Sequence, residues 1–517
     1  MSIPKVVGIE EEYAIHLQGD HGLTPFQASC ALVNSYARKA GLRAHKDKLL
    51  WDYGHETPFD DFRGDLFGKS TGQEIVSSAE NLRINAVLPN GARLYTDHAH
   101  PEYSTPECLS ARNLVACDKA GELIVRAALS AVREMMPGLK IGLFKNNIDY
   151  QGHSYGCHEN YLMDARAHEE CLVRSPDKAV RSLVPFLVTR QLFAGTGRVG
   201  SEKPQDPPVP YQMSQRADFI ENVFGLETMY ARPIINTRAE HHADPKRFRR
   251  LHLILGDANM SEFAGFLKIG STQMVLQMLE DSFLTEDLTL KDPVNALRKV
   301  AQFDSRLELA DGRTISPLDL QRLFLAAAER YYQSGPGSQV PDADLILQAW
   351  AYALDGLEKL RLSEDFELVE DPLNLSKRLD WVIKLWLIHR YRKSKGRSWE
   401  TQELSVFDLQ YHNVEPDSGL FWHLQSKGLV DRILEDDEIS RAVREAPLDT
   451  RAYFRGKCIE KFPNEINFVN WEVVGFDHGE SHRMIPLLNP LKGTKNQFRD
   501  VFDRCTNSRE LVKMVQA

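Results

Sequence analysis

Acidic residues occur inside predicted β-strands, and their spacing predicts a metal site. In the β-type run at residues 6–15, the two-residue period of a strand puts Glu10 and Glu12 on one face and Glu11 on the other. Two neighbouring carboxylates repel each other unless a cation lies between them. Oxygen ligands of this kind suit Mg²⁺ or Mn²⁺ better than zinc. We therefore expect a divalent cation beside Glu10 and Glu12.

The segment at residues 91–103 extends this oxygen-rich set. Tyr95 and Asp97 share one face of a predicted strand, and the turn through Pro101 brings Glu102 back towards them. A phenol oxygen and two more carboxylates are again hard ligands. The two segments together predict one metal-binding site.

Histidine and arginine stand in two further strand-like stretches. His158 and Glu159 are adjacent, so an extended chain points them to opposite faces, and we expect only one of them to reach the metal. Arg250 and His252 share a face, which pairs a guanidinium suited to phosphate with a possible metal ligand. For each cluster alone, an ion pair or a solvated strand edge is the simpler interpretation. Four clusters together favour a site, because such residues are costly to bury without partners.

Composition restricts the class of protein. The chain has 517 residues, of which 42% are hydrophobic and 26% charged, and its net charge is −10. These values are typical of a globular protein of two or three domains and argue against a general nucleic-acid binder. The N-terminus lacks a signal-peptide pattern, no apolar run approaches the roughly 18 residues of a membrane span, and the seven cysteines are scattered. We expect reduced thiols and a cytoplasmic protein without nucleic-acid or membrane partners.

The pattern of elements predicts an α+β fold, a sheet with helices packed on one side. Residues 379–388 are apolar nearly all round and predict a buried helix. A polar stretch within residues 51–83 lacks periodicity and is interpreted as a mobile insertion loop. We place a domain boundary near residue 440, giving a catalytic domain at 1–440 and a small C-terminal domain at 441–517. Expected strands include 92–96, 141–144 and 251–255, and an expected helix is 118–136.

In these motifs the chain resembles the family of Pup deamidases/depupylases (Dop) and Pup ligases (PafA). The resemblance covers almost the whole chain. It implies a glutamine-synthetase-like large domain, with an antiparallel sheet and packed helices, plus a small C-terminal α/β domain. The stretches that carry it, in one order, are 8–13, 90–103, 145–147, 154–161, 234–238, 250–252 and 256–259.

The resemblance also implies roles for individual residues, with ATP and Mg²⁺ as cofactors. Asp97 matches the catalytic aspartate. The implied Mg²⁺ ligands are Glu10, Tyr95 and Glu102, with Glu12, Glu159 and His252 as further members. Implied nucleotide contacts are Arg93, Thr105 and Trp471, and Arg216 and Arg238 are candidates for holding phosphate or the Pup C-terminus. Arg250, the guanidinium suited to phosphate, is a further candidate for binding the cofactor. The chain has no Walker A loop or G-x-G-x-x-G fingerprint, so metal and arginine would hold the nucleotide.

The implied reaction is hydrolysis of an amide at the C-terminal side chain of Pup. The bond is either that of a terminal Gln or the isopeptide link to a substrate lysine. Asp97 could attack the carbonyl as a nucleophile or activate water as a general base, and the sequence leaves both routes open. The implied partners are free Pup ending in Gln, pupylated proteins and, indirectly, the proteasomal ATPase.

Three features favour the deamidase branch over the ligase branch. The insertion at residues 51–83 occupies the place of a loop that ligases lack. The segment at 98–102 is one residue shorter than in ligases, and the sequence of residues 450–456 resembles that of deamidases. Two features depart from the family pattern, namely Glu11 and the amino-acid sequence of the insertion. The alternatives are a Pup ligase, a small-molecule carboxylate–amine ligase and a catalytically silent Pup-binding regulator.

Overall fold

The computed structural model describes residues 2–19, 22–42, 50–53, 60–64, 84–202, 208–335, 339–479 and 482–516. Of the predicted insertion at 51–83, only residues 51–53 and 60–64 are among these, and the rest lies outside the described residues. Within the described ranges, no helix is both long and apolar enough to cross a membrane. The seven cysteines form no disulfide.

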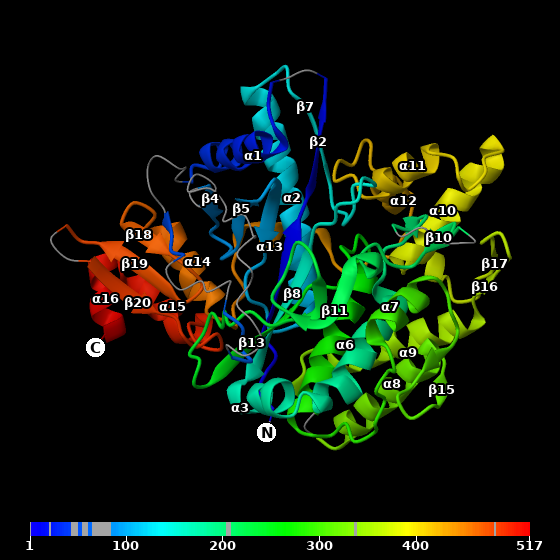
Figure 1. The fold of residues 1–517 in the computed structure, drawn as a ribbon. Helices are drawn as coiled ribbons and strands as arrows, with labels where there is room; N and C mark the ends of the chain where they lie inside the picture. Colours follow the sequence, from blue (N-terminus) through cyan, green and yellow to red (C-terminus); the bar gives the residue numbers. More distant parts are fainter. Residues whose placement is uncertain are drawn as a thin grey trace.

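An eight-stranded sheet runs through the middle of the molecule (Figure 1) in the order β11-β12-β13-β8-β1-β6-β5-β4. All neighbouring strands are antiparallel except β11 and β12, which are parallel. The predicted antiparallel sheet is therefore confirmed. Its strands are β1 (Val7–Glu12), β4 (Asn85–Val87), β5 (Arg93–Asp97), β6 (His100–Ser104), β8 (Cys157–Asp164), β11 (Ile220–Gly225), β12 (Arg232–Asn236) and β13 (Phe248–Leu253).

Two long helices cover one face of this sheet. α2 (Ala111–Met135) contacts β1, and α6 (Glu262–Glu280) contacts β8 and packs along α2. Ser110 and Ser261 cap their N-termini by accepting from the backbone N–H groups of Asn113 and Ala264. α6 is buried nearly all round, because α2, α5, α8 and α9 surround it. This packing fixes the strands whose other face carries the polar residues.

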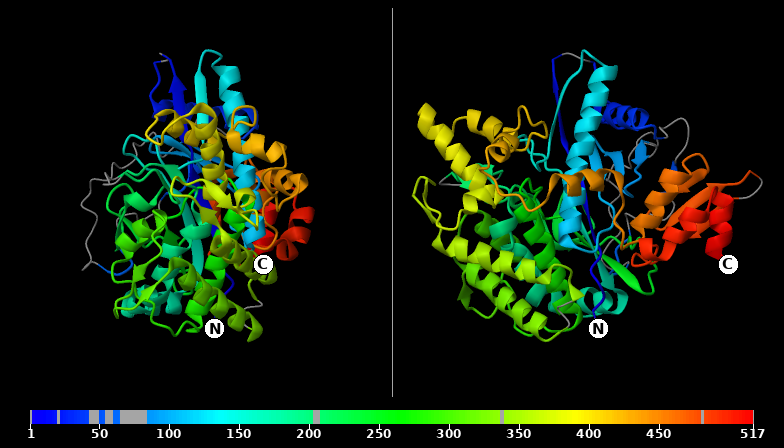
Figure 2. Two further views of the ribbon diagram at one scale, coloured as in Figure 1. Left: turned by 90° about the vertical axis from the view of Figure 1, so that its right-hand side faces the viewer. Right: turned by 180° about the vertical axis from the view of Figure 1, so that it is seen from behind.

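Further helices extend the core away from the sheet (Figures 1 and 2). The predicted buried helix is α10 (Asp380–Lys395), with Trp381 and Ile383 in the interior. α1 (Pro25–Lys39), by contrast, packs on α2 and on β4, β5 and β6 of the large sheet. The remaining α-helices and strands up to residue 444 are α3 (Ala165–His168), α4 (Val184–Thr189), α5 (Gln191–Ala194), α7 (Pro293–Ala301), α8 (Pro317–Gln333), α9 (Ala343–Lys359), α11 (Glu403–Tyr411), α12 (Leu420–Ser426), α13 (Asp436–Arg444), β2 (Ala14–Gln18), β7 (Lys140–Phe144), β9 (Arg198–Val199), β10 (Tyr211–Gln212), β14 (Leu307–Glu308), β15 (Thr314–Ile315), β16 (Arg361–Leu362) and β17 (Leu368–Glu370).

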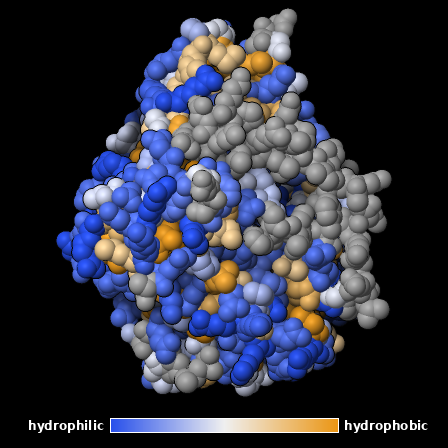
Figure 3. Space-filling view, turned by 90° about the vertical axis from the view of Figure 1, so that its left-hand side faces the viewer, coloured by the Kyte–Doolittle hydropathy of each residue, from blue (hydrophilic) through white to orange (hydrophobic). Residues whose placement is uncertain are grey.

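A second, smaller sheet lies to one side of the first (Figure 2) and has the order β20-β19-β18-β3. It has its own hydrophobic cluster, centred on Phe454, Phe476 and Phe502. The predicted boundary at residue 440 falls inside α13, which packs on α2, and the division at that point stays a prediction. The elements are β3 (Leu50–Trp51), β18 (Ile466–Val469), β19 (Val473–Asp477), β20 (His482–Pro486), α14 (Ala452–Lys461), α15 (Lys495–Arg504) and α16 (Ser508–Gln516). The outer surface on this side is mostly hydrophilic, with small separate hydrophobic patches (Figure 3).

A buried ion-pair cluster fastens α14 to the large sheet. Glu107 accepts from Arg451 Nε at 2.7 Å and from Arg455 Nη1 at 3.0 Å, and Arg455 also donates to the Gly91 carbonyl. A Cβ added at Gly456 would lie 2.3 Å from the Pro89 carbonyl oxygen, so the close approach requires glycine. Burial alone would raise the pKa of Glu107, but the two arginines hold it down to about 2.

Replacing Glu107 with Gln is expected to lower the free energy of unfolding by about 3 to 5 kcal/mol, because two buried guanidinium groups lose their counter-charge. The contribution of Glu107 is present above its ordinary pKa and is lost as pH falls towards 2, so the variant should differ least from the wild type in acid. Urea unfolding at neutral and acid pH measures this. Glu460→Gln, which breaks the exposed Lys457–Glu460 pair on the same helix, is the control and should change little. Equal effects of the two substitutions would contradict the prediction.

Candidate functional site

Cross-strand pairing gathers the predicted acidic residues on one face of the large sheet. Glu12 of β1 lies opposite Glu102 of β6, and Tyr95 of β5 lies opposite Glu102 on its other side. Glu10 lies opposite His158 of β8. Directly opposed residues on neighbouring strands share a face, so the register brings these side chains together.

The first group of possible metal ligands consists of Glu12, Asp97 and Glu102, whose oxygens lie within 4.8 Å of one another. The Tyr95 hydroxyl donates to Glu102. Burial, and then the charges of Asp97 and Glu12, raise the pKa of Glu102 well above its usual value. Three converging carboxylates of this kind fit a hard divalent cation, which would remove their mutual repulsion.

The second group consists of Glu10, His158 and His252, again with one ligand atom each within 4.8 Å. Neither ring nitrogen of His252 has a hydrogen-bond partner among the described residues, although the side chain is only 5% exposed. Burial, followed by the charge of Arg250, lowers the pKa of His252 well below its usual value. The ring is therefore neutral, which is the form that binds metals. Gly156 leaves room for this histidine, because a Cβ at that position would lie 2.1 Å from His158 Nε2 and would displace the ring.

The structure corrects one predicted metal ligand. Glu159 belongs to neither group, because it points to the opposite face of β8, away from Glu10. There it accepts from Arg190 Nη2 at 2.5 Å and Nη1 at 2.9 Å, and from the Tyr161 hydroxyl at 2.7 Å. Its charge is thus already compensated inside the protein. The residue of this segment that joins a candidate group is His158, which the sequence interpretation left out of the metal set.

Asp97 lies at the exposed end of the first group. It is the last residue of β5, and its side chain is 36% exposed, whereas that of Glu12 is 11% exposed. His98 follows with a positive φ of 49° in the turn to β6, and its Nδ1 lies 3.0 Å from Asp97 Oδ2. The carboxylate is therefore held beside the metal group while one side of it stays open to a substrate.

His100 is a further residue that the sequence interpretation missed. Its Nδ1 lies 3.1 Å from Glu12 Oε2, and the Gly156 N–H donates to Glu12 Oε1 at 2.8 Å. Burial would raise the pKa of Glu12, but His100, His158 and the Gly156 N–H lower it to about 2. Glu12 is therefore ionised, as a metal ligand must be.

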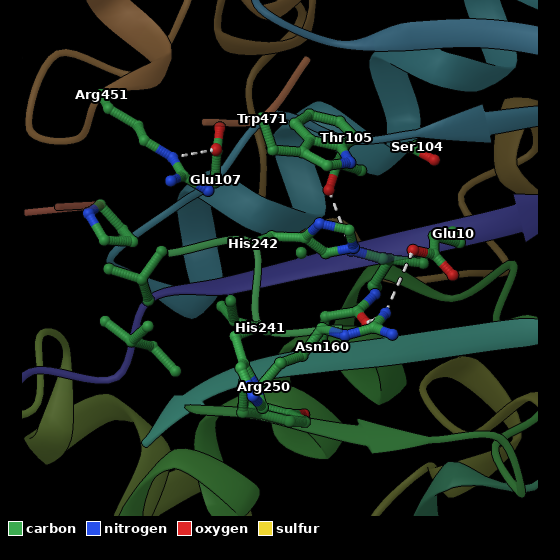
Figure 4. A pocket seen from close by; sticks show the side chains of 17 residues that line it. Glu10, Ser104, Thr105, Glu107, Asn160, His241, His242, Arg250, Arg451 and Trp471 are labelled. Carbon is green, nitrogen blue, oxygen red and sulfur yellow. Dashed lines mark hydrogen bonds and ion pairs between the residues drawn. The ribbon is translucent and has the colours of Figure 1, made fainter. Parts of the chain in front are cut away.

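A pocket of about 570 Å³ opens beside Glu10 (Figure 4). Apolar residues such as Val6 and Leu162 form part of its wall, and Glu10 both lines the pocket and belongs to the second metal group. Polar and aromatic side chains complete the wall, namely Ser104, Thr105, Glu107, Asn160, His241, His242, Arg250, Arg451 and Trp471.

Three of the six residues predicted to bind the cofactor line this pocket, namely Thr105, Arg250 and Trp471. Arg93 does not line it, but it lies opposite Ser104, which does. Among the residues that sequence reasoning missed are His241 and His242, which follow β12 and carry no strand periodicity that could have indicated them.

Two predicted arginines lie outside the wall of the pocket. Arg216 is 1% exposed and donates to Ser154 Oγ and to the carbonyls of Tyr155 and Ile254, so it supports the segment that precedes His158. Arg238 is half-buried at the end of β12 and donates to the Leu226 carbonyl. The structure brings neither side chain into contact with the pocket.

The antiparallel sheet carries two converging groups of candidate metal ligands beside a pocket, an arrangement that fits the glutamine-synthetase-like fold implied by the sequence. The chain belongs to the family described as Pup-ligase protein, whose model matches residues 5–475.

Similar proteins carry two different names within this family. The chain is 43% identical to a depupylase of Acidothermus cellulolyticus over 98% of both chains. It is 42% identical to a Pup–protein ligase of Acidimicrobium ferrooxidans, over 72% of this chain and 79% of that one. The ligase PafA in complex with Pup has a TM-score of 0.76 and 28% identity, covering 99% of this chain and 94% of that chain. PafA with ADP has a TM-score of 0.69 and 33% identity, covering 81% and 89%.

Proposed function

We propose that this chain is a Pup deamidase and depupylase, which converts the C-terminal Gln of Pup to Glu and hydrolyses the isopeptide bond between Pup and substrate lysines. The observation that carries the proposal is the open carboxylate of Asp97 at the edge of a metal-type cluster. The likeness to a depupylase extends over 98% of the chain, whereas the likeness to a Pup–protein ligase covers 72%. That difference supports the hydrolytic branch.

We also propose ATP and Mg²⁺ as cofactors. The oxygen ligands Glu12, Glu102 and Tyr95 suit Mg²⁺, and Glu10 and His252 suit a second divalent cation. The pocket beside Glu10 is lined by the cationic Arg250 and the aromatic Trp471, which suit the phosphates and the base of a nucleotide, and a solved PafA is in complex with ADP. Bound cations would supply the positive charge that polarises a substrate carbonyl and stabilises an oxyanion. In this proposal the nucleotide completes the site and is not consumed with each cleavage.

The proposed reaction replaces one bond at the γ-carbonyl carbon of the last Pup residue. The carbon–nitrogen bond breaks, the carbon gains an oxygen that comes from water, and the nitrogen takes up a proton. The leaving group is ammonia from a terminal Gln or the ε-amine of lysine from a conjugate. Pup ending in Glu is the product in both cases.

Asp97 has two possible routes to this product. As a nucleophile, one of its oxygens attacks the carbon, and water then resolves the anhydride; as a general base, it takes a proton from the attacking water. His98, 3.0 Å from Oδ2, orients the carboxylate for either route. Single turnover in heavy-oxygen water separates them, because only the nucleophilic route can place a heavy oxygen on Asp97 itself.

A gel assay of a pupylated protein with the purified chain, Mg²⁺ and ATP tests the proposal. We expect free Pup and the unmodified protein to form. The same chain offered Pup-Glu, ATP and a lysine-bearing protein should give no conjugate. Conjugation without cleavage would indicate a ligase, and Pup binding without either reaction would indicate a silent regulator.

A further inference from the structure

Residues 51–53 belong to the predicted insertion, yet the structure makes them part of the small C-terminal sheet. Trp51 of β3 pairs in parallel with Val469 of β18, and the Asp52 N–H donates to the Val469 carbonyl at 3.1 Å. Asn470 Nδ2 donates to Asp52 Oδ2 at 3.2 Å. The segment is therefore fixed next to Trp471, an aromatic residue of the pocket wall.

The Trp51 ring contacts Arg93 and Trp471, the two residues beside it that the family resemblance implies as nucleotide contacts. It lies 4.1 Å from the Arg93 guanidinium carbon, and it meets the Trp471 ring edge to face with centroids 5.1 Å apart. The guanidinium carbon also lies 3.7 Å from the centre of the Tyr95 ring and 5.3 Å from that of the Tyr53 ring. Arg93 thus has aromatic rings around it, a cation–π arrangement that is strong when buried.

The Arg93 guanidinium is also held by hydrogen bonds. Arg93 Nη2 donates to the Tyr53 hydroxyl at 2.7 Å, and Arg93 Nε donates to Asn85 Oδ1 at 2.6 Å. Asn85 Nδ2 in turn donates to the Tyr53 hydroxyl at 3.0 Å. Two hydrogen bonds from the guanidinium and the nearby rings of Trp51, Tyr53 and Tyr95 therefore restrict its orientation.

That orientation matters because Arg93 lies where the pocket meets the metal groups. It is opposite Ser104 of the pocket wall, and it packs on Tyr95, whose hydroxyl donates to Glu102 of the first metal group. Its positive charge also acts on Glu10. A displaced guanidinium would weaken the binding of an anion beside both metal groups.

We infer that Trp51 and Tyr53 are positioning residues for nucleotide binding, which act by holding Arg93 and Trp471 in place. The inference rests on the proposed function, because it takes the pocket to be the nucleotide site. It gives the start of the insertion a role in building the pocket.

Calorimetric titration of the full chain with ADP and Mg²⁺ tests this. We expect Trp51→Leu to raise the dissociation constant about tenfold, because the cation–π contact and the edge contact are lost. Trp51→Phe, which keeps an aromatic ring, should retain most of the affinity. Tyr53→Phe removes only the hydroxyl and should weaken binding about fivefold. The matched control is Trp386→Leu, since Trp386 is half-buried and holds Arg390 at 5.0 Å elsewhere on the surface. It should leave ADP binding unchanged.

A double-mutant cycle distinguishes positioning from a general structural role. If Tyr53 acts through Arg93, Tyr53→Phe should cause no further loss of ADP affinity once Arg93 is replaced by Ala. Additive losses, or unchanged ADP binding in Trp51→Leu and Tyr53→Phe, would overturn the inference while leaving the proposed function intact. A wild-type chain that binds no ADP would contradict the nucleotide proposal itself, and this inference with it.

Discussion

Asp97→Asn is expected to lower the rates of both deamidation and depupylation at least about 10³-fold, because the neutral amide can neither attack a carbonyl nor accept a proton from water. The substitution changes charge but hardly changes volume. Asp97 is also absent from the pocket wall, so nucleotide binding should persist. Rates of Pup release, measured with ADP binding on the same preparation, check both expectations.

The chain offers a matched control for this substitution. Asp149 pairs with His153 at 2.7 Å, as Asp97 pairs with His98, but it lies outside both metal groups. Asp149→Asn should therefore leave both activities near the wild-type level. Turnover by Asp97→Asn close to that of the wild type would remove Asp97 from its proposed role.

Glu10→Gln is expected to lower activity at least about 100-fold and to weaken both metal and nucleotide binding. Glu10 is the one residue that belongs to a metal group and also lines the pocket, as far as the described residues go. The amide keeps the shape of the side chain but loses the charge that a divalent cation and Arg250 require. Mn²⁺ titration followed by electron paramagnetic resonance reports the metal affinity without relying on turnover.

The neighbouring residue supplies the control. Glu11 is buried on the opposite face of β1, where burial raises its pKa to about 8. It is therefore mostly protonated at neutral pH, and Gln closely resembles the protonated acid. Glu11→Gln should leave Mn²⁺ binding and activity nearly unchanged. Equal losses in the two variants would show that the face of the strand does not matter, contrary to the proposed site.

The two-residue strand period was enough to predict which acidic side chains share a face of the sheet. Glu10 and Glu12 point to one side and Glu11 to the other, as expected for β1, and Tyr95, Asp97 and Glu102 meet across β5 and β6. Both β5 and β6 come from one short stretch of chain, joined by a tight turn. Local geometry alone therefore determines their relative placement.

Choosing between His158 and Glu159 required information that a single strand does not contain. Adjacent residues take opposite faces, but which face meets Glu10 depends on the register between β1 and β8. The compensating partner of Glu159 is Arg190, which follows α4 and lies 31 positions further along the chain. No local pattern indicates such a pair.

Long-range packing also explains the residues that remained unpredicted around the pocket. Glu107 is fixed by arginines more than 340 positions away, and Trp51 reaches Trp471 only because β3 joins a sheet formed by the C-terminal segment. These contacts depend on how the small sheet packs against the large one. The family resemblance indicated Trp471, but it gave no reason to place Trp51 beside it.

Cleavage of a pupylated protein in heavy-oxygen water, followed by mass spectrometry of the released Pup, tests the central claim most directly. We predict that Pup is released with a C-terminal Glu that carries heavy oxygen from the water over repeated turnovers, that the substrate lysine is left unmodified, and that Asp97→Asn releases none. Release that persists in Asp97→Asn, or an intact conjugate together with ATP-dependent attachment of Pup-Glu to lysine, would contradict the account.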